Sequence, residues 1–245
     1  MTEFAQLFKK NGICLHMSFI FCTFARFLWR IMKIALIGYG KMGHMIEDIA
    51  LSRGHDIVAH IDVGDEFDLK NAEVAIEFTT PTTAKDNILR AWAQNVPVVC
   101  GTTGWRPEEL KIKNYEFKIK DNKTIITDET GKTMLVWSSN YSVGVNIFFD
   151  LNKALASAMK AQPQYTPSIT ETHHIHKLDK PSGTAKTLAE QIGTDVAIES
   201  IREGEVPGTH VVTWDSEEDT IIITHIAKGR RGFALGAVLA AESLV

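Results

Sequence analysis

The chain has 245 residues, of which 44% are hydrophobic and 23% charged, a composition typical of a globular protein with one large domain or two modest ones. Its formal net charge is -4 and its pI is about 6.1, so it lacks the basic field of a nucleic-acid-binding protein. Its three cysteines, Cys14, Cys22 and Cys100, have neither metal-ligand spacing nor the pattern of a disulfide framework, which fits a reducing compartment. We therefore expect a cytoplasmic protein that acts on a small molecule, with no nucleic-acid or membrane partner.

Residues 1–31 differ from the rest of the chain. Lysine and arginine surround an apolar stretch at residues 13–24 that resembles a poor signal peptide or membrane anchor. This stretch is too short and too interrupted to span a bilayer, and no small-residue cleavage site separates it from MKIALIG at Met32. We therefore expect translation to start at Met32, and residues 1–31 to be an extension that is poorly ordered or packed outside the core.

From Met32 onward, apolar strands alternate with helical stretches, which indicates a parallel sheet covered by helices. Strands are predicted at Lys33–Ile37, Asp56–Ile61, Val74–Phe78 and Val96–Cys100. Apolar residues at helical spacing fill the intervals between the first and second strands and between the third and fourth. The sequence therefore predicts βαβ units of a Rossmann-type dinucleotide-binding domain.

A second, sheet-based domain is predicted further along the chain. Residues 111–133 are polar and predict a hairpin or polar insertion without chemistry, and a short strand at Met134–Trp137 then leads into an amphipathic helix. Strands follow at Ser168–His174, His210–Trp214 and Thr220–Ile226, and the C-terminal stretch predicts a helix that returns to the first domain. We expect residues 32–141 and 226–245 to form the dinucleotide-binding domain, and residues 142–225 to form a smaller α+β substrate-binding and oligomerisation domain with a mixed open sheet.

The first strand ends in a glycine-rich loop, GYGKMG, that directly precedes a helix. In a dinucleotide site Gly38 permits the tight turn, Gly40 lets the backbone approach the pyrophosphate, and Gly43 lets helix and strand pack closely. Asp62, at the end of the second strand, suits the adenosine ribose hydroxyls. No Lys or Arg follows Asp62 to bind the 2′-phosphate of NADPH. We therefore expect NADH or NADPH as the cofactor, with a mild preference for NADH, because Lys41 can still supply a positive charge for a 2′-phosphate. An ordinary strand-to-helix turn is the alternative.

Two hydroxyl-rich loops follow the third and fourth strands. They contain Phe78, Thr79 and Thr80 in the first case and Gly101, Thr102, Thr103 and Gly104 in the second. Ligands of open α/β sheets bind at the carboxyl ends of the strands, so these loops are predicted to line the nicotinamide side of the cofactor site. Simple turn chemistry would explain the same residues.

The segment ETHHIHKLDKPSGTA concentrates three histidines, His173, His174 and His176, with Lys177 and Lys180, unlike the acidic remainder of the chain. PSGTA then opens a helix whose first residues offer hydroxyls and free amides to a carboxylate or phosphate. A histidine in this segment can donate a proton once an anionic substrate is bound, and Lys177 can donate a proton or clamp the anion. The segment therefore predicts a catalytic and anion-binding site.

Other chemistries remain open for the same segment. His174 and His176 would face one side of a strand as an HxH metal pair, although Lys177 beside them would repel a cation. Lys177 could also form a Schiff base with a substrate. A further alternative is that the histidines of this segment are structural or surface residues without a catalytic role. We expect no metal.

The motifs GYGKMG, FTTP, GTTG, SSNYSVGVN, ETHHIHKLDKPSGTA, REGEVPGTH and HIAKGRRGFALGAVLAAESL together resemble the 4-hydroxy-tetrahydrodipicolinate reductase family, historically dihydrodipicolinate reductase. The resemblance extends over nearly all of the chain from Met32. It implies an oxidoreductase of diaminopimelate and L-lysine biosynthesis, acting on a CH–CH group, that reduces the dehydrated 4-hydroxy-tetrahydrodipicolinate to tetrahydrodipicolinate with NAD(P)H. It also implies a cytoplasmic homotetramer that associates through the second-domain sheets.

The resemblance also assigns roles to residues. His173 is implied as the catalytic proton donor and acceptor and Lys177 as a second donor, with a small dicarboxylate substrate held by His174, Ser182, Gly183 and Thr184. The residues implied at the cofactor are Gly38, Gly40, Lys41, Met42, Gly43, Asp62, Phe78, Thr79, Gly101, Thr102, Thr103, Ser139, Asn140 and Tyr141. Two rival functions remain: a noncatalytic dinucleotide-sensing protein, since fold does not fix function, and a metal-dependent hydrolase using His174 and His176.

Overall fold

The computed structural model describes residues 30–120, 123–193 and 195–245, and residues 33–245 form one compact unit. The expectation for residues 1–31 falls almost entirely on residues outside the described ones. Across the described ranges, no helix has the length and apolar character needed to cross a membrane.

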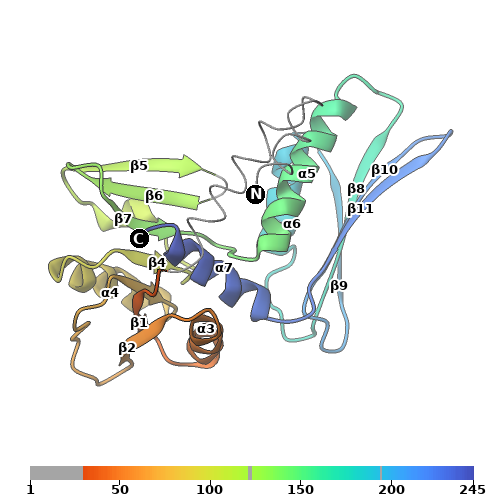
Figure 1. The fold of residues 1–245 in the computed structure, drawn as a ribbon. Helices are drawn as coiled ribbons and strands as arrows, with labels where there is room; N and C mark the ends of the chain where they lie inside the picture. Colours follow the sequence, from red (N-terminus) through yellow and green to blue (C-terminus); the bar gives the residue numbers. More distant parts are fainter. Residues whose placement is uncertain (1–29, 121–122, 194) are drawn as a thin grey trace, which may run out of the picture. The chain divides into compact units, whose positions relative to one another are not determined.

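A seven-stranded sheet with the order β2-β1-β3-β4-β7-β6-β5 forms the first half of this unit (Figure 1). Five strands run parallel: β1 (Lys33–Ile37), β2 (Asp56–Ile61), β3 (Val74–Glu77), β4 (Val98–Cys100) and β7 (Thr133–Trp137). The predicted hairpin is confirmed as β5 (Tyr115–Lys120) and β6 (Lys123–Asp128), which extend the sheet beyond β7, with β6 antiparallel to both β7 and β5. The chain leaves β1 toward β2 and later returns to β3 on the other side, so a ligand crevice is expected at the carboxyl ends of β1 and β3.

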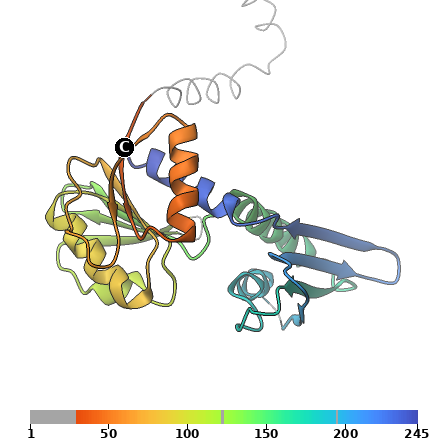
Figure 2. The same cartoon turned by 90° about the horizontal axis from the view of Figure 1, so that it is seen from below.

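Helices cover both faces of this sheet. Ala35 and Ile37 of β1 pack with Ala84 and Ile88 of α4 (Pro81–Ala93). The alternation of side chains along a strand turns Ile34 and Leu36 to the opposite face, where α3 (Lys41–Ser52) and α7 (Arg231–Glu242) pack together (Figure 2). α7 also contacts β3 and β4, so the predicted return of the C-terminal helix to the first sheet is confirmed.

The second sheet has four strands in the order β11-β10-β8-β9. They are β8 (Thr166–His173), β9 (Ala197–Arg202), β10 (Thr209–Asp215) and β11 (Thr220–Ile226), with β8 and β9 parallel and the other pairs antiparallel. α5 (Val143–Met159) and α6 (Gly183–Ile192) cover one face through a core that includes Phe148, Leu188, Ile169 and Trp214. The predicted mixed sheet is confirmed, and β9, with its polar sequence AIESIR, is the strand that the pattern did not predict.

Some predicted strand bounds are wrong: β3 ends at Glu77, β4 begins at Val98, and the difference at β8 bears on the site. β8 ends at His173 rather than His174, because the chain turns there and the amide of Lys177 donates to the carbonyl of His174 at 3.1 Å. His174 and His176 therefore do not share one face of a strand, as the metal-pair reading required. His176 instead pairs with Glu205 at 3.1 Å, and both of these side chains are exposed.

Candidate active site

The glycine loop has the geometry of a phosphate-binding turn. Gly38 has φ +91, and a Cβ there would lie 2.2 Å from the carbonyl oxygen of Phe78. A Cβ on Gly43 would lie 2.5 Å from the carbonyl oxygen of Gly38, whereas one on Gly40 would meet nothing within 4 Å. Gly38 and Gly43 thus permit close packing, and Gly40 faces open space at the start of α3. No side chain caps that helix end, so its first amides can meet an anion.

Three cavities follow the carboxyl ends of the parallel strands. The cavity at the glycine loop measures about 450 Å³ and is lined by Gly40, Lys41, Met42, Phe78, Thr79, Gly101, Thr102 and Thr103. A cavity of about 590 Å³ lies beside it and is lined by residues that include Gly38, Gly40, Asp62, Asp65, Phe67, Phe78, Thr79 and Arg90. The third, about 280 Å³, is lined by Met42, Phe78, Gly101, Ser138, Ser139, Tyr141, Arg230 and Phe233. Gly43 is buried in α3 beneath the loop.

Three hydrogen bonds connect the segments that line these cavities. The amide of Thr79 donates to Thr102 Oγ1 at 2.8 Å, which joins the two hydroxyl-rich loops. The hydroxyl of Tyr141 donates to the backbone carbonyls of Val136 at 2.7 Å and Cys100 at 3.1 Å. Tyr141 thus lines the third cavity, and its hydroxyl joins the ends of β4 and β7.

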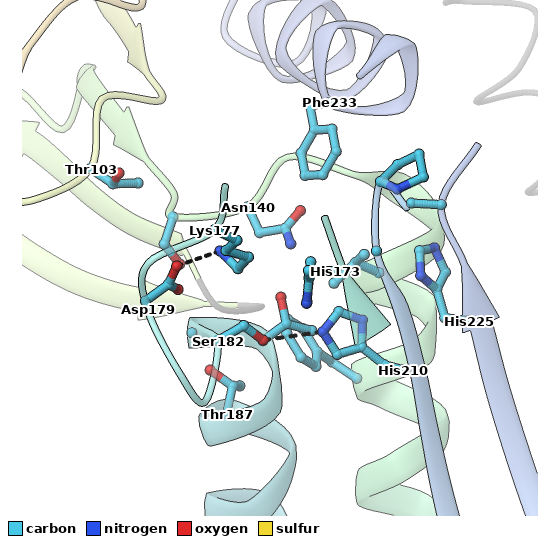
Figure 3. Close-up of a pocket in the computed structure, with 18 of the residues that line it drawn as sticks. Thr103, Asn140, His173, Lys177, Asp179, Ser182, Thr187, His210, His225 and Phe233 are labelled. Carbon is cyan, nitrogen blue, oxygen red and sulfur yellow. Dashed lines mark hydrogen bonds and ion pairs between the residues drawn. The ribbon is translucent and has the colours of Figure 1, made fainter. Parts of the chain in front are cut away.

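The histidine segment opens onto a separate cavity of about 410 Å³. All six residues predicted for catalysis and substrate binding line it: His173, His174, Lys177, Ser182, Gly183 and Thr184. Thr103, Ser139 and Asn140 line it as well, and Figure 3 shows Asn140, Lys177 and His173 around a common space below Phe233. Because Thr103 also lines the glycine-loop cavity, the anion site and the dinucleotide site adjoin.

The start of α6 provides the anion-binding half of the cavity. Ser182 is the N-cap, and its Oγ accepts from the amide of Ala185 at 3.2 Å and lies 3.2 Å from His210 Nε2. Gly183 and Thr184 form the first turn, where backbone amides and the positive end of the helix dipole favour a carboxylate. Lys177 adds a cation to the lining of the same cavity and pairs with Asp179 at 2.7 Å.

Burial governs the charge of the histidines around this cavity. Desolvation lowers the pKa of His173, and the nearby Lys177 and Arg202 lower it further, while Glu171 opposes them. Desolvation and the neighbouring His173 lower the pKa of His210 to about 4. The cavity thus contains imidazoles that resist protonation until an anion or a carboxylate compensates the added charge.

Several residues at the cavity carry chemistry that sequence reasoning did not assign. They are Asp179, His210, His225, Phe233 and, beneath the cavity, Glu171. His210 lies directly opposite Glu171 in the pairing of β10 with β8, and His225 comes from the next strand, β11 (Figure 3). The signal available in the sequence was the period-2 alternation of THVVTWD, which turns His210 to the same face as the apolar core residues Val212 and Trp214.

Among the described residues, the one group with metal-ligand geometry comprises Glu171, His173 and His210, whose ligand atoms lie within 4.8 Å of one another. It does not include the pair His174 and His176. Arg202 donates to Glu171 at 3.2 Å, and Lys177 is close enough to lower the pKa of His173. Fixed cations at this spot disfavour a further cation.

The comparisons with known proteins agree with this architecture. Two family models, described as dihydrodipicolinate reductase N-terminus and C-terminus, match residues 32–141 and 144–245. A 4-hydroxy-tetrahydrodipicolinate reductase of Christiangramia forsetii is 44% identical over 232 residues, which cover 87% of this chain and 92% of that protein. The enzyme of the same description from Thermosipho africanus is 34% identical over 215 residues, with the same coverage of 87% and 92%.

A solved structure supports the fold. The dipicolinate-bound dihydrodipicolinate reductase of Paenisporosarcina sp. TG-14 aligns with a TM-score of 0.66 at 20% identity, covering 88% of this chain and 95% of that one. Both domains and nearly all residues from Met32 onward are thus accounted for by one family. The chain belongs to the 4-hydroxy-tetrahydrodipicolinate reductase family, whose models are named dihydrodipicolinate reductase.

Proposed function

We propose that this chain uses NAD(P)H to reduce the dehydrated form of 4-hydroxy-tetrahydrodipicolinate to tetrahydrodipicolinate, in the cytoplasm, as a step of diaminopimelate and L-lysine biosynthesis. The observation that carries the proposal is the shared wall of the two sites: Thr103 lines both the glycine-loop cavity and the histidine cavity. A hydride donor and an anionic acceptor can therefore meet where the two cavities join. The dipicolinate bound to the Paenisporosarcina enzyme is a dicarboxylate, as the proposed substrate is.

The residues around the glycine loop fit a dinucleotide. The open space at Gly40 and the uncapped start of α3 suit the pyrophosphate, with Gly38 and Gly43 shaping the loop. Asp62 is the proposed ribose partner, and the proposed lining of the remaining site comprises Lys41, Met42, Phe78, Thr79, Gly101, Thr102, Thr103, Ser139, Asn140 and Tyr141. When bound, NAD(P)H supplies a hydride.

At the substrate, the chain holds carboxylates and moves a proton. Ser182, Gly183 and Thr184 offer a hydroxyl and helix-start amides to one carboxylate, with His174 and Lys177 on the adjoining wall. His173 is the proposed donor of the proton that completes the reduction, and Lys177 is the second donor. Burial of His173 keeps its ring neutral until the dianionic substrate favours protonation.

The adenosine end of the cofactor site favours NADH. Asp62 and Asp65 line this cavity, and their carboxylates would repel a 2′-phosphate. The cation in the same cavity, Arg90, lies over the ring of Phe67 at 4.1 Å. We expect kcat/KM to be higher with NADH than with NADPH, and Val63→Arg, at an exposed position of the same wall, to move the ratio toward NADPH. An unchanged ratio in Val63→Arg would contradict this placement of the ribose.

We further propose that residues 32–141 and 226–245 form the dinucleotide-binding domain and residues 142–225 the substrate-binding domain. This division is supported by the packing of α7 on α3, β3 and β4. We propose a homotetramer formed through the face of the four-stranded sheet that no described helix covers. Two isoleucines of β11 are exposed on that face, Ile222 at 57% and Ile226 at 64%, and an apolar, threonine-rich strand surface suits sheet-to-sheet contact between copies.

The decisive experiment is a coupled assay in which the upstream synthase supplies the substrate. Oxidation of NADH or NADPH that depends on the synthase product, and that persists in EDTA, is the expected result. Tight cofactor binding without turnover would favour a dinucleotide sensor. Loss of turnover in EDTA that is restored by a divalent metal would favour a metal-dependent enzyme and contradict the proposal that no metal takes part.

A further inference from the structure

Glu171 is a carboxylate inside the second domain that the proposed chemistry leaves without a role. It lies on β8, between β10 and β9, with 0% of its surface exposed, and its side chain points to the same face as Ile169 and His173. Fully buried carboxylates are rare unless they are paired. The groups that contact the Glu171 carboxylate therefore indicate its role.

The two oxygens of Glu171 have different partners. Oε1 accepts from the amide of Ser182 at 3.0 Å and from the Arg202 guanidinium at 3.2 Å. Oε2 lies 3.3 Å from His173 Nδ1 and 3.8 Å from His210 Nε2. Oε2 and His173 Nδ1 are both buried, and neither has a hydrogen-bond partner with good geometry among the described residues. Each of these two atoms is thus the nearest available partner of the other.

Strand register fixes this arrangement. His210 is the residue opposite Glu171 in β10, and Arg202 is the residue opposite His173 in β9. Arg202 also donates to the carbonyls of Asp179 at 2.5 Å and Lys177 at 3.2 Å. Glu171 and Arg202 together therefore connect the proton-handling turn, the start of α6 and the ring of His173.

We propose that Glu171 is a positioning residue for His173: its Oε2 accepts a hydrogen bond from Nδ1–H and leaves Nε2 as the atom that exchanges a proton with the substrate. Nε2 lies on the other side of the ring, where a Cβ on Gly208, a residue that lines the cavity, would be 3.1 Å away. This inference rests on the proposed function, because it assigns Nε2 as the donor in that reaction.

The proton balance follows from this geometry. The imidazolium of His173 carries protons on both nitrogens, the Nε2 proton passes to the substrate, and the neutral ring keeps the Nδ1 proton against Glu171. The charged groups around the ring are Glu171 on its own strand, Arg202 on β9, and Lys177 and Asp179 on the following turn; the His210 ring on β10 lies 5.0 Å away. Burial, Lys177 and Arg202 lower the pKa of His173, and Glu171 raises it. Removing the carboxylate charge would lower the pKa further.

Glu171→Gln tests the proposal, because it keeps the shape and removes the charge. We expect kcat to fall by a factor on the order of 10²–10⁴, the range that proton transfer by a well-positioned side chain contributes, with a smaller change in KM. Because His173 must be protonated to donate, the alkaline limb of the kcat profile should move to lower pH. Glu171→Asp, which retains the charge, should keep that limb nearer the wild-type position. Glu205→Gln is the matched control, since it alters the exposed pair of Glu205 with His176 outside the cavity.

A second measurement needs no variant. Nitrogen chemical shifts of His173 in the folded wild-type protein report its tautomer, and we expect the proton of the neutral ring on Nδ1. A neutral ring protonated on Nε2 would overturn the proposal even if Glu171→Gln failed to fold. Wild-type activity together with an unchanged rate and pH profile in Glu171→Gln would also overturn it. Failure of the wild-type protein to turn over substrate would instead contradict the proposed function, and the tautomer would still test the role of Glu171.

Discussion

At the scale of single residues, His173 is the position on which the proposed chemistry depends most. His173→Ala removes the proposed proton donor, and we expect kcat to fall by a factor on the order of 10²–10⁴ with cofactor affinity unchanged. His176→Ala is the matched control, because His176 is exposed and pairs with Glu205 outside the cavity. Steady-state kinetics of both variants, measured with the synthase product as substrate, test this prediction. Full activity of His173→Ala would contradict it and would indicate that Lys177 donates the proton.

His210 should control how stability depends on pH. Its pKa falls from 6.5 to about 4 on folding, because burial disfavours the charged ring. Between these two pH values the unfolded chain therefore binds more protons at this residue than the folded chain does. The contribution of neutral His210 to the free energy of unfolding is fully present above pH 6.5 and is lost as the pH falls toward 4. At about 1.4 kcal/mol per pKa unit this group accounts for a loss of roughly 3 kcal/mol.

Urea unfolding of the wild type and His210→Gln at several pH values between 4 and 7 would check this, with 6.5 and about 4 as the limits of the affected window. Glutamine cannot gain a proton in this range, so the free energy of unfolding should vary less with pH in the variant. His176→Gln, at an exposed position, should follow the wild-type curve. Parallel curves for the wild type and His210→Gln would show that the buried imidazole does not set the slope.

At the scale of elements, the contact between α7 and the segment that joins β7 to α5 depends on one glycine. A Cβ on Gly236 would lie 1.6 Å from the carbonyl oxygen of Tyr141, which is backbone and cannot rotate away. Gly236→Ala should therefore force the helix outward and lower the free energy of unfolding by about 3 kcal/mol. It should also weaken cofactor binding, because Tyr141 lines the cavity beside Met42.

Gly232, one turn earlier on the same helix, supplies the control. A Cβ there would meet its nearest atom, Ser142 Oγ, at 3.6 Å, which is ordinary contact. Gly232→Ala should leave stability unchanged or raise it by about 0.5–1 kcal/mol through helix propensity. Equal unfolding midpoints for the two alanine variants in urea would contradict the close approach of α7 to Tyr141.

The elements also show what the sequence can and cannot predict. β1 is predicted to the residue, because four apolar residues follow Lys33 and a glycine loop ends the strand. β9 is missed because its sequence AIESIR lacks the alternation of apolar and polar residues that marks a strand, and its pairing with β8 sets its conformation. The cavity histidines of one segment could be predicted from local spacing. His210 and Glu171 could not be, since their contact depends on the register between β8 and β10.

At the scale of the whole molecule, the uncovered face of the second sheet determines the proposed assembly. α5 and α6 pack on one face. The other face presents Ile222 opposite Thr213 and Ile226 opposite Thr209 in the pairing of β11 with β10. No described helix packs on this second face, and apolar side chains in register on a strand surface favour association with an identical surface through a two-fold axis.

Ile222→Glu tests that assembly without touching the cavity. The carboxylate would be buried without a partner in a sheet-to-sheet contact, so the variant should dissociate to smaller species at micromolar concentration while the wild type remains tetrameric. Light scattering after gel filtration measures both masses, and circular dichroism confirms that the variant is folded. Ile147→Glu on α5, also an exposed isoleucine at 55% but in the helical layer on the other side of the sheet, should not change the mass. If Ile147→Glu dissociated while Ile222→Glu remained a tetramer, the interface would lie on the helical layer instead.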